Sequence, residues 1–416
     1  MNGVLNSYDF SIMSILSELS DPASWDAYFQ YKKENRHLTK SEETDLLQLI
    51  TGREYLPVTE RILCGGSFSV PEKKMIRKMN TGKKRVVYTY PREENYVLKL
   101  LTWLLLRKYD GIFSENLYSF RVSYGTAKAM GRILSSGRIR EKFTYKADIH
   151  NYFNSIDPDL MLRDLSAVLT DDDPLYEMFR SMLLDRRALD RGRIIEEEKG
   201  VMAGTPFAVF LANIYLREMD REFSEKGLLY ARYSDDIIVF TDTAEEREAA
   251  EERIREILTE RKLSLNPEKE IRTDPGQMWT FLGISYENGT VDISPVSKEK
   301  LKAKIRRKAR NIRRWQVRKG ARNDQAARAF LRAMNRKFFD CDVSSELTWT
   351  RWYFPLISTD RSLREIDRYM QYWARVLASG TRSGKRYGFR YTDLKEAGYV
   401  SLLHEWYRYR KDGFSV

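Results

Sequence analysis

Two adjacent aspartates, Asp235 and Asp236, end the motif Tyr-Ser-Asp-Asp at residues 233–236. The segments on either side, 228–232 and 237–240, are apolar and rich in β-forming side chains, which predicts a hairpin with the acidic pair at its tip. Neighbouring carboxylates repel each other unless water or a cation screens them. Paired carboxylates on a rigid turn suit Mg²⁺, a hard ion that prefers oxygen ligands. Taken alone, the pair is explained better by a solvated turn.

A third carboxylate, Asp148, ends a strand-like segment at residues 143–149. The helix that follows is predicted to begin at Asp157 and Pro158, a typical capping pair. A carboxylate at a strand end can belong to an active site, although Asp148 by itself is interpreted more simply as a turn residue. An acidic run is not sufficient evidence of a site: residues 171–173, before Pro174, predict only a helix cap.

Two further segments have residue types that suit phosphate binding. Residues 66–91 are basic and alternate around Arg85, which predicts a hairpin whose cations, Lys83 among them, can grip a triphosphate. An exposed edge strand is the plainer reading. Gly204 stands in a flexible turn in which Thr205 is predicted to cap a helix that starts at Pro206. Such a turn lets backbone N–H groups approach a phosphate, but it also suits an ordinary loop-to-helix junction.

The remaining elements indicate the fold class. Strands and helices alternate without a regular βαβ rhythm, so the sequence predicts an α+β fold with an antiparallel sheet. Helices are expected at residues 93–108, 207–215 and 243–262, and strands at 263–266 and 281–286, followed by a turn at Asn288 and Gly289.

Basic residues are concentrated in one segment. The net charge is +12, yet residues 298–337 alone hold 17 Lys or Arg and only two acidic residues. Such a block predicts a polyanion partner, with a solvated helix face as the alternative. The two cysteines and the scattered histidines give neither a disulfide framework nor a zinc spacing. No apolar run is long enough to span a bilayer, so we expect no membrane association and a cytoplasmic location.

Taken in order, these segments resemble the reverse transcriptase superfamily, in its prokaryotic group II intron and retron-like branch. The matching fragments are Asp148, Gly204-Thr205-Pro206 with Ala212-Asn213, the Tyr-Ser-Asp-Asp motif, Lys269, Phe281-Leu282-Gly283 and Ser119-Phe120-Arg121. The resemblance is greatest to stand-alone, defence-associated bacterial reverse transcriptases. Those enzymes work with a co-encoded structured RNA against phage, and we found no retron Val-Thr-Gly element and no Cys/His-rich endonuclease tail.

The resemblance implies a right-hand polymerase with fingers, an antiparallel-sheet palm, a helical thumb and an α-helical C-terminal extension. The expected parts are an N-terminal helical extension over 1–60, fingers and the start of the palm over 61–147, a palm over 148–294 from which 160–199 return to the fingers, a basic thumb over 295–340, and an aromatic-rich helical region over 341–416.

The resemblance also implies two-metal phosphoryl transfer, with two Mg²⁺ ions (or Mn²⁺) held by Asp148, Asp235 and the backbone carbonyl of Ile149. Asp236 would support the charge and geometry of the metal site. These three aspartates are the expected catalytic residues, and dNTPs the expected substrates.

Nucleotide contacts follow from the same resemblance. Lys83 and Arg85 would clamp the triphosphate, and Phe153 would stand as a steric gate against a 2′-hydroxyl. The other expected nucleotide-binding residues are Ile149, Ala203, Gly204 and Lys269. Ala203 replaces the glutamine that is usual in the family, which puts templated copying in question.

Nucleic-acid contacts are expected mainly from the basic thumb. The partners would be a template, in particular a structured non-coding RNA, and a DNA primer or product. The expected contact residues are Arg121, Lys302, Lys304, Arg306, Arg307, Lys308, Arg310, Arg313, Arg314 and Trp315.

Two alternatives remain beside RNA-directed DNA synthesis. The missing glutamine is compatible with an untemplated or protein-primed DNA polymerase of the abortive-infection type. A non-catalytic RNA-binding protein derived from a polymerase is the other, although all three carboxylates are present. The sequence does not give the oligomeric state.

Overall fold

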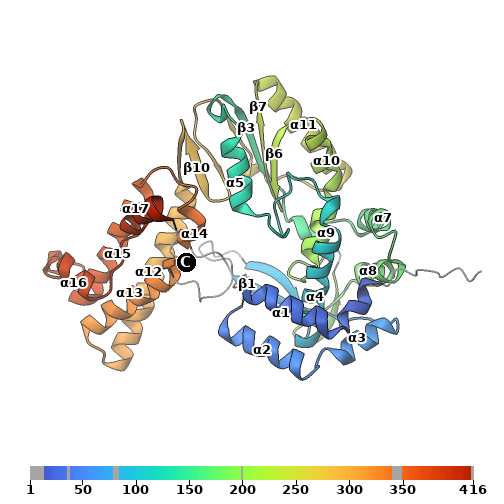
Figure 1. The fold of residues 1–416 in the computed structure, drawn as a ribbon, viewed down its shortest axis with the longest axis horizontal. Helices are drawn as coiled ribbons and strands as arrows, with labels where there is room; N and C mark the ends of the chain where they lie inside the picture. The colour runs from blue at the N-terminus through green and yellow to red at the C-terminus, as the bar shows by residue number, and fades with distance from the viewer. Residues whose placement is uncertain (1–13, 35–37, 78–83, 198–199, 340–348, 414–416) are drawn as a thin grey trace, which may run out of the picture.

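The protein was analysed as a computed structural model, which describes residues 14–34, 38–77, 84–197, 200–339 and 349–413. The described elements form an arch in the view of Figure 1. A twisted sheet with its helices lies at the top, the N-terminal helices lie at the lower right, and the C-terminal helices lie at the left.

The sheet at the top of the arch is antiparallel throughout, which confirms the predicted class. Its order is β6 (Leu229–Tyr233), β7 (Asp236–Thr241), β3 (Phe143–Asp148) and β8 (Ile271–Thr273). The strand predicted at 263–266 is wrong: Leu265 makes only an isolated bridge to Ile149. Pro267 follows at once and has no N–H to donate, so pairing stops there and resumes at β8.

The two faces of this sheet pack against different cores, because successive side chains of a strand point to opposite faces. Ile237 and Val239 join the core shared with the N-terminal helices and with α11 (Ala244–Glu260). Ile238 and Phe240 join the core shared with α5 (Thr126–Ser135) and with the C-terminal helices. The sheet is therefore buried on both sides and forms a rigid platform.

A second sheet joins two distant parts of the chain. Its order is β2 (Lys84–Thr89), β1 (Glu72–Arg77), β4 (Arg187–Asp190) and β5 (Arg193–Glu196). Four helices lie below it in the view of Figure 1: α1 (Pro22–Glu34), α2 (Lys40–Thr51), α3 (Leu56–Leu63) and α4 (Arg92–Lys108). The helix expected at 93–108 is thus confirmed as α4.

Four further helices lie in the chain between strands of the two sheets, and one of their caps differs from the prediction. They are α7 (Pro158–Val168), α8 (Asp173–Leu184), α9 (Ala208–Tyr215) and α10 (Arg217–Glu225). Asp157 caps α7 and Asp172 caps α8, as expected. Thr205 does not cap α9: its hydroxyl donates back to the Met202 carbonyl, and regular helix begins only after Phe207.

The predicted strand at 281–286 is two strands. β9 (Trp279–Phe281) and β10 (Ile284–Glu287) pair across Leu282 and Gly283, whose φ angles are 46° and 87°. Glycine tolerates this left-handed conformation, which reverses the chain within two residues. The predicted turn at 288–289 is confirmed, since it joins β10 to β11 (Thr290–Ile293).

The left-hand lobe is helical. It holds α12 (Pro295–Lys319), α13 (Asn323–Phe339), α14 (Trp349–Tyr353), α15 (Arg361–Ser379), α16 (Tyr391–Glu396) and α17 (Leu402–Asp412). One face of α12 is buried at a helical spacing that runs from Leu301 to Gln316. Trp373 and Trp406 are core residues. Over the described ranges, no helix has the length and apolar character needed to cross a membrane.

Candidate active site

The tip of the β6–β7 hairpin carries the acidic pair. Tyr233 pairs with Asp236, which leaves Ser234 and Asp235 as a two-residue turn, with Ser234 at φ 58°. The neighbouring strand is in register so that Asp148 lies directly opposite Asp236. The Ile149 N–H donates to the Asp235 carbonyl at 3.0 Å and thereby attaches the turn to the end of β3. Carboxylates from two distant segments, Asp148 and the Asp235–Asp236 pair, therefore lie at the same end of the sheet.

Repulsion among these carboxylates affects the pKa of Asp236. Burial, and then the neighbouring Asp235 and Asp148, raise the pKa of Asp236 above its ordinary value, against the lowering effect of Lys146. Asp148 is buried and pairs with Lys269, whose Nζ lies 2.6 Å from Oδ2. Lys269 ends a 3-10 turn that begins at Pro267, and Asn266 holds this turn to the Asp148 carbonyl through its N–H at 2.8 Å.

The donor set fits a divalent cation, although no group of three possible metal ligands is already assembled within the described ranges. Its oxygens are carboxylates, which hard cations prefer. Two of those carboxylates face each other across a ladder, an arrangement that is destabilising unless positive charge is nearby. In this structure the Lys269 ammonium supplies that charge to Asp148. The residues that could hold a metal are thus Asp148, Asp235 and Asp236, with the Ile149 carbonyl beside them.

A buried ion pair supports the turn from below. The Arg232 guanidinium donates to both oxygens of Asp220, from Nε at 2.8 Å and from Nη2 at 2.5 Å, and both side chains are almost wholly buried. Arg232 Nη1 also donates to the Ser234 carbonyl at 3.3 Å. Tyr230 completes the group through its hydroxyl, which donates to Asp220 Oδ1 at 2.9 Å. The conformation of the turn is thereby tied to α10.

The same arginine reaches the helix α9. Its Nη2 donates to the Asn213 carbonyl at 3.2 Å, while the Asn213 side chain exchanges two hydrogen bonds with Ser119. The residue predicted beside Ser119 as a nucleic-acid contact, Arg121, is placed differently from the prediction. Its guanidinium is buried and donates to Asp110 and to the Ser114 carbonyl, so its donors are used inside the protein.

Two of the predicted nucleotide contacts, Ala203 and Gly204, lie against strand β2 of the second sheet. The Tyr88 N–H of β2 donates to the Ala203 carbonyl at 2.9 Å, and Ala203 itself is buried. Gly204 has φ +102°, and a Cβ there would stand 2.9 Å from the Val87 side chain, so only glycine fits against β2. Asn154, which the sequence did not single out, accepts from the Ala203 N–H at 3.4 Å.

The structure describes the other predicted nucleotide contacts to different extents. Phe153 lies on α6 (Tyr152–Ser155), half-buried, with its ring centroid 5.8 Å from that of Tyr152. Arg85 is described as backbone of β2, opposite Ile76. Lys83 lies outside the described residues, as do residues 78–82 of the predicted hairpin. Lys269 lies among the carboxylates rather than beside Ala203.

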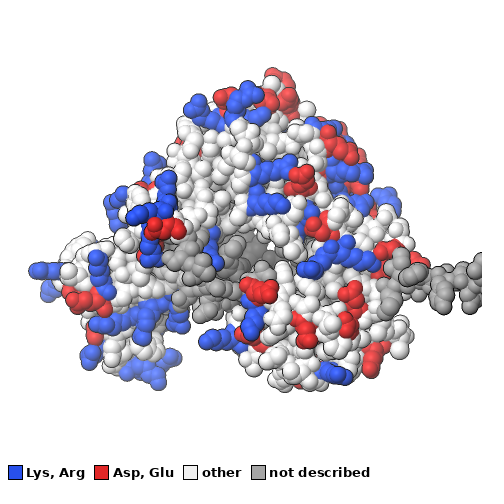
Figure 2. Space-filling model, in the orientation of Figure 1, with Lys and Arg blue, Asp and Glu red and all other residues white. Residues whose placement is uncertain are grey.

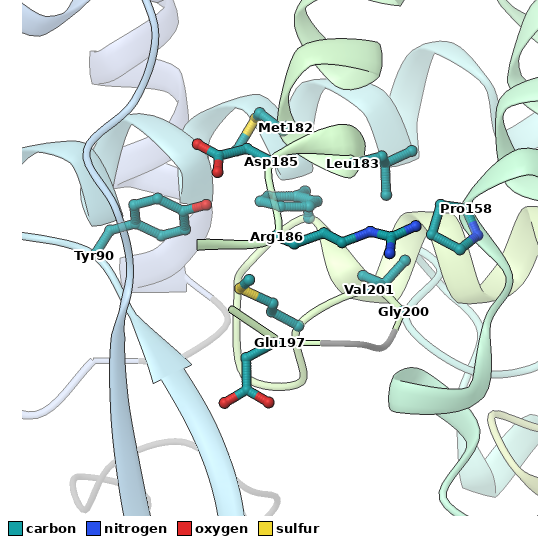
Figure 3. A pocket seen from close by; sticks show the side chains of 11 residues that line it. Tyr90, Pro158, Met182, Leu183, Asp185, Arg186, Glu197, Gly200 and Val201 are labelled. Carbon is teal, nitrogen blue, oxygen red and sulfur yellow. The ribbon is translucent and has the colours of Figure 1, made fainter. Parts of the chain in front are cut away.

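A nearby pocket is too small for a nucleotide. Figure 3 shows it between Tyr90, Arg186 and the turn at Gly200. Its volume is about 20 Å³, which is room for one water molecule. Gly200 lines it and lies tightly against the neighbouring backbone, because a Cβ there would meet the Asn154 carbonyl oxygen at 2.6 Å. This pocket is therefore a packing gap behind the loop and not a substrate site.

The basic segment presents its cations along the outer face of α12. Lys302 is half-buried and pairs with Glu299 and Glu365, while Arg313 donates to the Gly380 carbonyl and Trp315 packs against the core. The remaining predicted contacts are exposed and form no ion pair with any described residue: Lys304, Arg306, Arg307, Lys308, Arg310 and Arg314. Figure 2 shows Lys and Arg side chains gathered on this lobe.

Comparison with known proteins agrees with the order of these motifs. A family model described as "Reverse transcriptase (RNA-dependent DNA polymerase)" matches residues 73–286, more than half of the chain. The chain belongs to the reverse transcriptase family. The suspected relationship is thus confirmed, and the sheet that carries the carboxylates is the palm of a right-hand polymerase fold.

Individual relatives of this reverse transcriptase are distant. It is 25% identical over 134 residues to the retron Ec83 reverse transcriptase of Escherichia coli, a match that covers 30% of this chain and 41% of that protein. Among solved structures it resembles apo telomerase from Candida tropicalis, with a TM-score of 0.48, 13% identity and coverage of 82% of this chain and 69% of that one. For telomerase from Candida albicans in complex with a fragment of telomeric RNA, the TM-score is 0.43 and the sequence identity 11%. That match covers 83% of this chain and 64% of the other.

Sequence reasoning missed Arg232, Asp220 and Asn154. A charged residue within the apolar run of 228–240 was the available signal for Arg232, because a central strand rarely carries an unpaired cation. Nothing in the sequence identified Asp220 as its partner.

Proposed function

We propose that this reverse transcriptase is an active RNA-directed DNA polymerase that extends a primer with dNTPs. The observation that carries the proposal is the register of β3 and β7, which places Asp148 opposite Asp236 and attaches Asp235 to Ile149. A protein that had kept only RNA binding would have no need for three repelling carboxylates at one sheet edge.

In this proposal Asp148 and Asp235 would hold two divalent metal ions, with the Ile149 carbonyl as a further ligand and Asp236 as electrostatic support. When bound, Mg²⁺ or Mn²⁺ lowers the pKa of a primer 3′-hydroxyl and neutralises charge on the phosphates. Lys269 can exchange its contact with Asp148 for one with the triphosphate, since its side chain is 54% exposed. The buried Arg232 keeps the turn in place while these charges change.

Selection of the nucleotide is proposed to lie on the fingers side. Phe153 would pack against the sugar where a 2′-hydroxyl would stand and so favour deoxynucleotides. Lys83 and Arg85 would hold the triphosphate through charge-assisted hydrogen bonds. Support comes from the contact of Tyr88 with Ala203 and from the close approach of Gly204 to β2, which keep the loop and the hairpin in one arrangement.

The outer face of α12 is proposed to grip the template–primer duplex. Six exposed cations on one helix face suit a phosphate backbone, and counterion release makes such binding salt-dependent. If about six phosphates are contacted, affinity should fall by roughly 10³ between 50 and 200 mM salt. Exchange of these residues for Gln should flatten that dependence and leave the carboxylates intact.

Incorporation of dNTPs tests the activity. Protein purified with its RNA should extend a primer in Mg²⁺, and Asp235→Asn should abolish extension. Asp242→Asn is the matched control, because Asp242 directly follows the same hairpin but lies exposed beside Lys142. Wild-type protein that binds RNA yet never turns over dNTPs would point to the non-catalytic alternative. Full activity of Asp235→Asn would refute the site.

Sequencing the product and the co-purified nucleic acid tests the finer proposals. We expect a cDNA complementary to a structured non-coding RNA, and a strain that carries the gene should restrict phage plating. A random or homopolymeric product, indifferent to RNA, would favour untemplated synthesis, and product bonded to a Tyr or Ser hydroxyl would show protein priming.

A further inference from the structure

A cavity on the N-terminal side of the fingers has a lining unlike that of the small pocket shown in Figure 3. Its volume is about 410 Å³, within the range of small-molecule sites. The side chains that define it come from α1 and α4: Tyr28, Tyr31, Lys32, Lys99 and Trp103. Two cations and three aromatic rings therefore surround one space.

The two lysines are only partly compensated: Lys32 Nζ lies 5.5 Å from the centre of the Tyr28 ring, and Lys99 Nζ lies 4.8 Å from that of the Tyr96 ring. Desolvation lowers the pKa of both, and their mutual repulsion lowers that of Lys32 further. Neither forms an ion pair with a described residue, although Lys33, the neighbour of Lys32, pairs with Glu43. Glu42 raises the pKa of both lysines and Asp45 raises that of Lys99, but Glu42 already accepts the Thr39 N–H at 2.9 Å in a helix cap. A bound anion would offset the cost of holding two half-buried ammonium groups side by side.

The aromatic rings form one connected wall. The Trp103 ring lies 5.7 Å from that of Tyr28 and 5.7 Å from that of Tyr31. On another side the Arg107 guanidinium covers the indole at 4.8 Å. Rings held in this way are preorganised for stacking, and stacking on aromatic side chains accepts any base.

The cavity also adjoins the proposed nucleotide site. Gly204 and Pro206, which precede α9, line its far side together with Thr89 of β2. Because Gly204 is pressed against β2, this part of the loop has no room to withdraw. A ligand in the cavity would thus lie next to the loop proposed to receive the incoming nucleotide.

We propose that this cavity binds a nucleoside phosphate, with its base against the Trp103 wall and its phosphate between Lys32 and Lys99. Either an unpaired nucleotide of an RNA strand or a free nucleotide has this chemistry. An RNA strand is the expected source, because the cavity opens beside the loop proposed to receive the incoming nucleotide, and the template base that pairs with that nucleotide must lie close to it, a point that rests on the proposed function. Binding itself does not require polymerase activity.

Equilibrium binding without dNTPs or metal tests the site. The probes are a short fluorescein-labelled single-stranded RNA and a fluorescent adenosine monophosphate, measured by anisotropy at a salt concentration that weakens contacts to phosphate alone. The variants are Lys32→Gln with Lys99→Gln, and separately Trp103→Leu. Lys33→Gln is the control on the same helix, because Lys33 is exposed and does not line the cavity.

We expect each variant to weaken RNA binding about tenfold or more, while Lys33→Gln stays near wild type. Loss of only the mononucleotide would identify a free nucleotide as the ligand. Wild-type affinity of the lysine double variant for both probes, with an unchanged melting temperature, would overturn the proposal whatever the effect of Trp103→Leu on folding. The assay measures binding and needs no catalysis. A protein without polymerase activity could therefore still bind the probes in this cavity, and an active polymerase could show no binding there.

Discussion

Two carboxylate–cation pairs flank the Tyr-Ser-Asp-Asp turn, and they differ in their access to water. Asp220 and Arg232 are 1% and 0% exposed at their side chains, with additional hydrogen bonds from Tyr230 and to Ser234. Asp148 is similarly buried at 8%, but its partner Lys269 is 54% exposed. The first pair is enclosed by protein on both sides, whereas the second has one partner in solvent.

This difference separates a supporting role from a reactive one. A buried ion pair is expensive to break, because a single charge would remain without water or partner. An exposed lysine loses little when its partner is taken by another cation or when a phosphate takes its place. The turn is therefore held by the Asp220–Arg232 pair, which keeps its partners. The Asp148–Lys269 pair beside it can exchange its partners for a metal ion and a phosphate.

The largest effect on activity is expected from Asp148→Asn. The substitution keeps the shape but removes the charge that would hold the metal, so dNTP incorporation should fall by at least about 10³-fold, or about 4 kcal/mol. The free energy of unfolding should change by less than about 1 kcal/mol, because Lys269 is solvated. Primer extension and urea denaturation measure the two quantities. Activity within tenfold of wild type would remove Asp148 from the site.

Arg232→Met should have the largest effect on stability. It leaves Asp220 buried and unpaired, at a cost of about 3–5 kcal/mol. The double variant Asp220→Leu with Arg232→Met should recover much of that loss, since an apolar pair can replace a buried ion pair. Incorporation per folded molecule should stay low, because the Ser234 and Asn213 carbonyls still lack their donor. Full recovery of both stability and incorporation would show that the pair does not position the turn.

Lys269→Gln should act on the substrate and spare the fold. Loss of a charge-assisted contact to a triphosphate costs about 1.5–3 kcal/mol, so KM for dNTP should rise roughly tenfold or more. The melting temperature should hardly move. Lys262→Gln is the matched control, because Lys262 is an exposed lysine that pairs with Asp157 away from the carboxylates. Equal KM values for the two variants would contradict a role in exchange.

The smallest effect is expected from Asp236→Asn in metal-free buffer at neutral pH. Burial and two neighbouring carboxylates raise the pKa of Asp236, so its charged form opposes folding there. Removal of that charge should raise the melting temperature by at most a few degrees, as measured by calorimetry. A lower melting temperature would mean that the Asp236 carboxylate makes a stabilising contact that its charge requires.

Local patterns carried most of the correct predictions. The α4 helix, the Asp157 cap and the turn at 288–289 depend on residues that lie close together in the chain. Predictions were wrong where a distant partner decided the outcome. Leu265 looked like part of a strand, but β3 pairs instead with β8, and Thr205 turned back to Met202 rather than capping α9.

Resemblance and structure also disagreed over Arg121. Its motif suggested a contact to nucleic acid, yet the side chain is enclosed and bonded to Asp110. The burial of an arginine depends on which carboxylate the fold brings near it, and residue type alone does not specify that. Arg232 is the converse case, since its charge was visible in the sequence while Asp220 was not identifiable as its partner.

The sequence by itself determined that residues 228–240 form a hairpin with two aspartates at its tip, because apolar β-forming segments and a short polar turn act locally. Only the tertiary structure decided what that tip can do. Pairing with β3 brought Asp148 opposite Asp236, and the packing of α10 placed Asp220 beneath the turn. The cavity between α1 and α4 likewise depends on the side-by-side packing of two helices. Such contacts join residues that are far apart in the chain, and a local sequence pattern does not specify which distant residues come together.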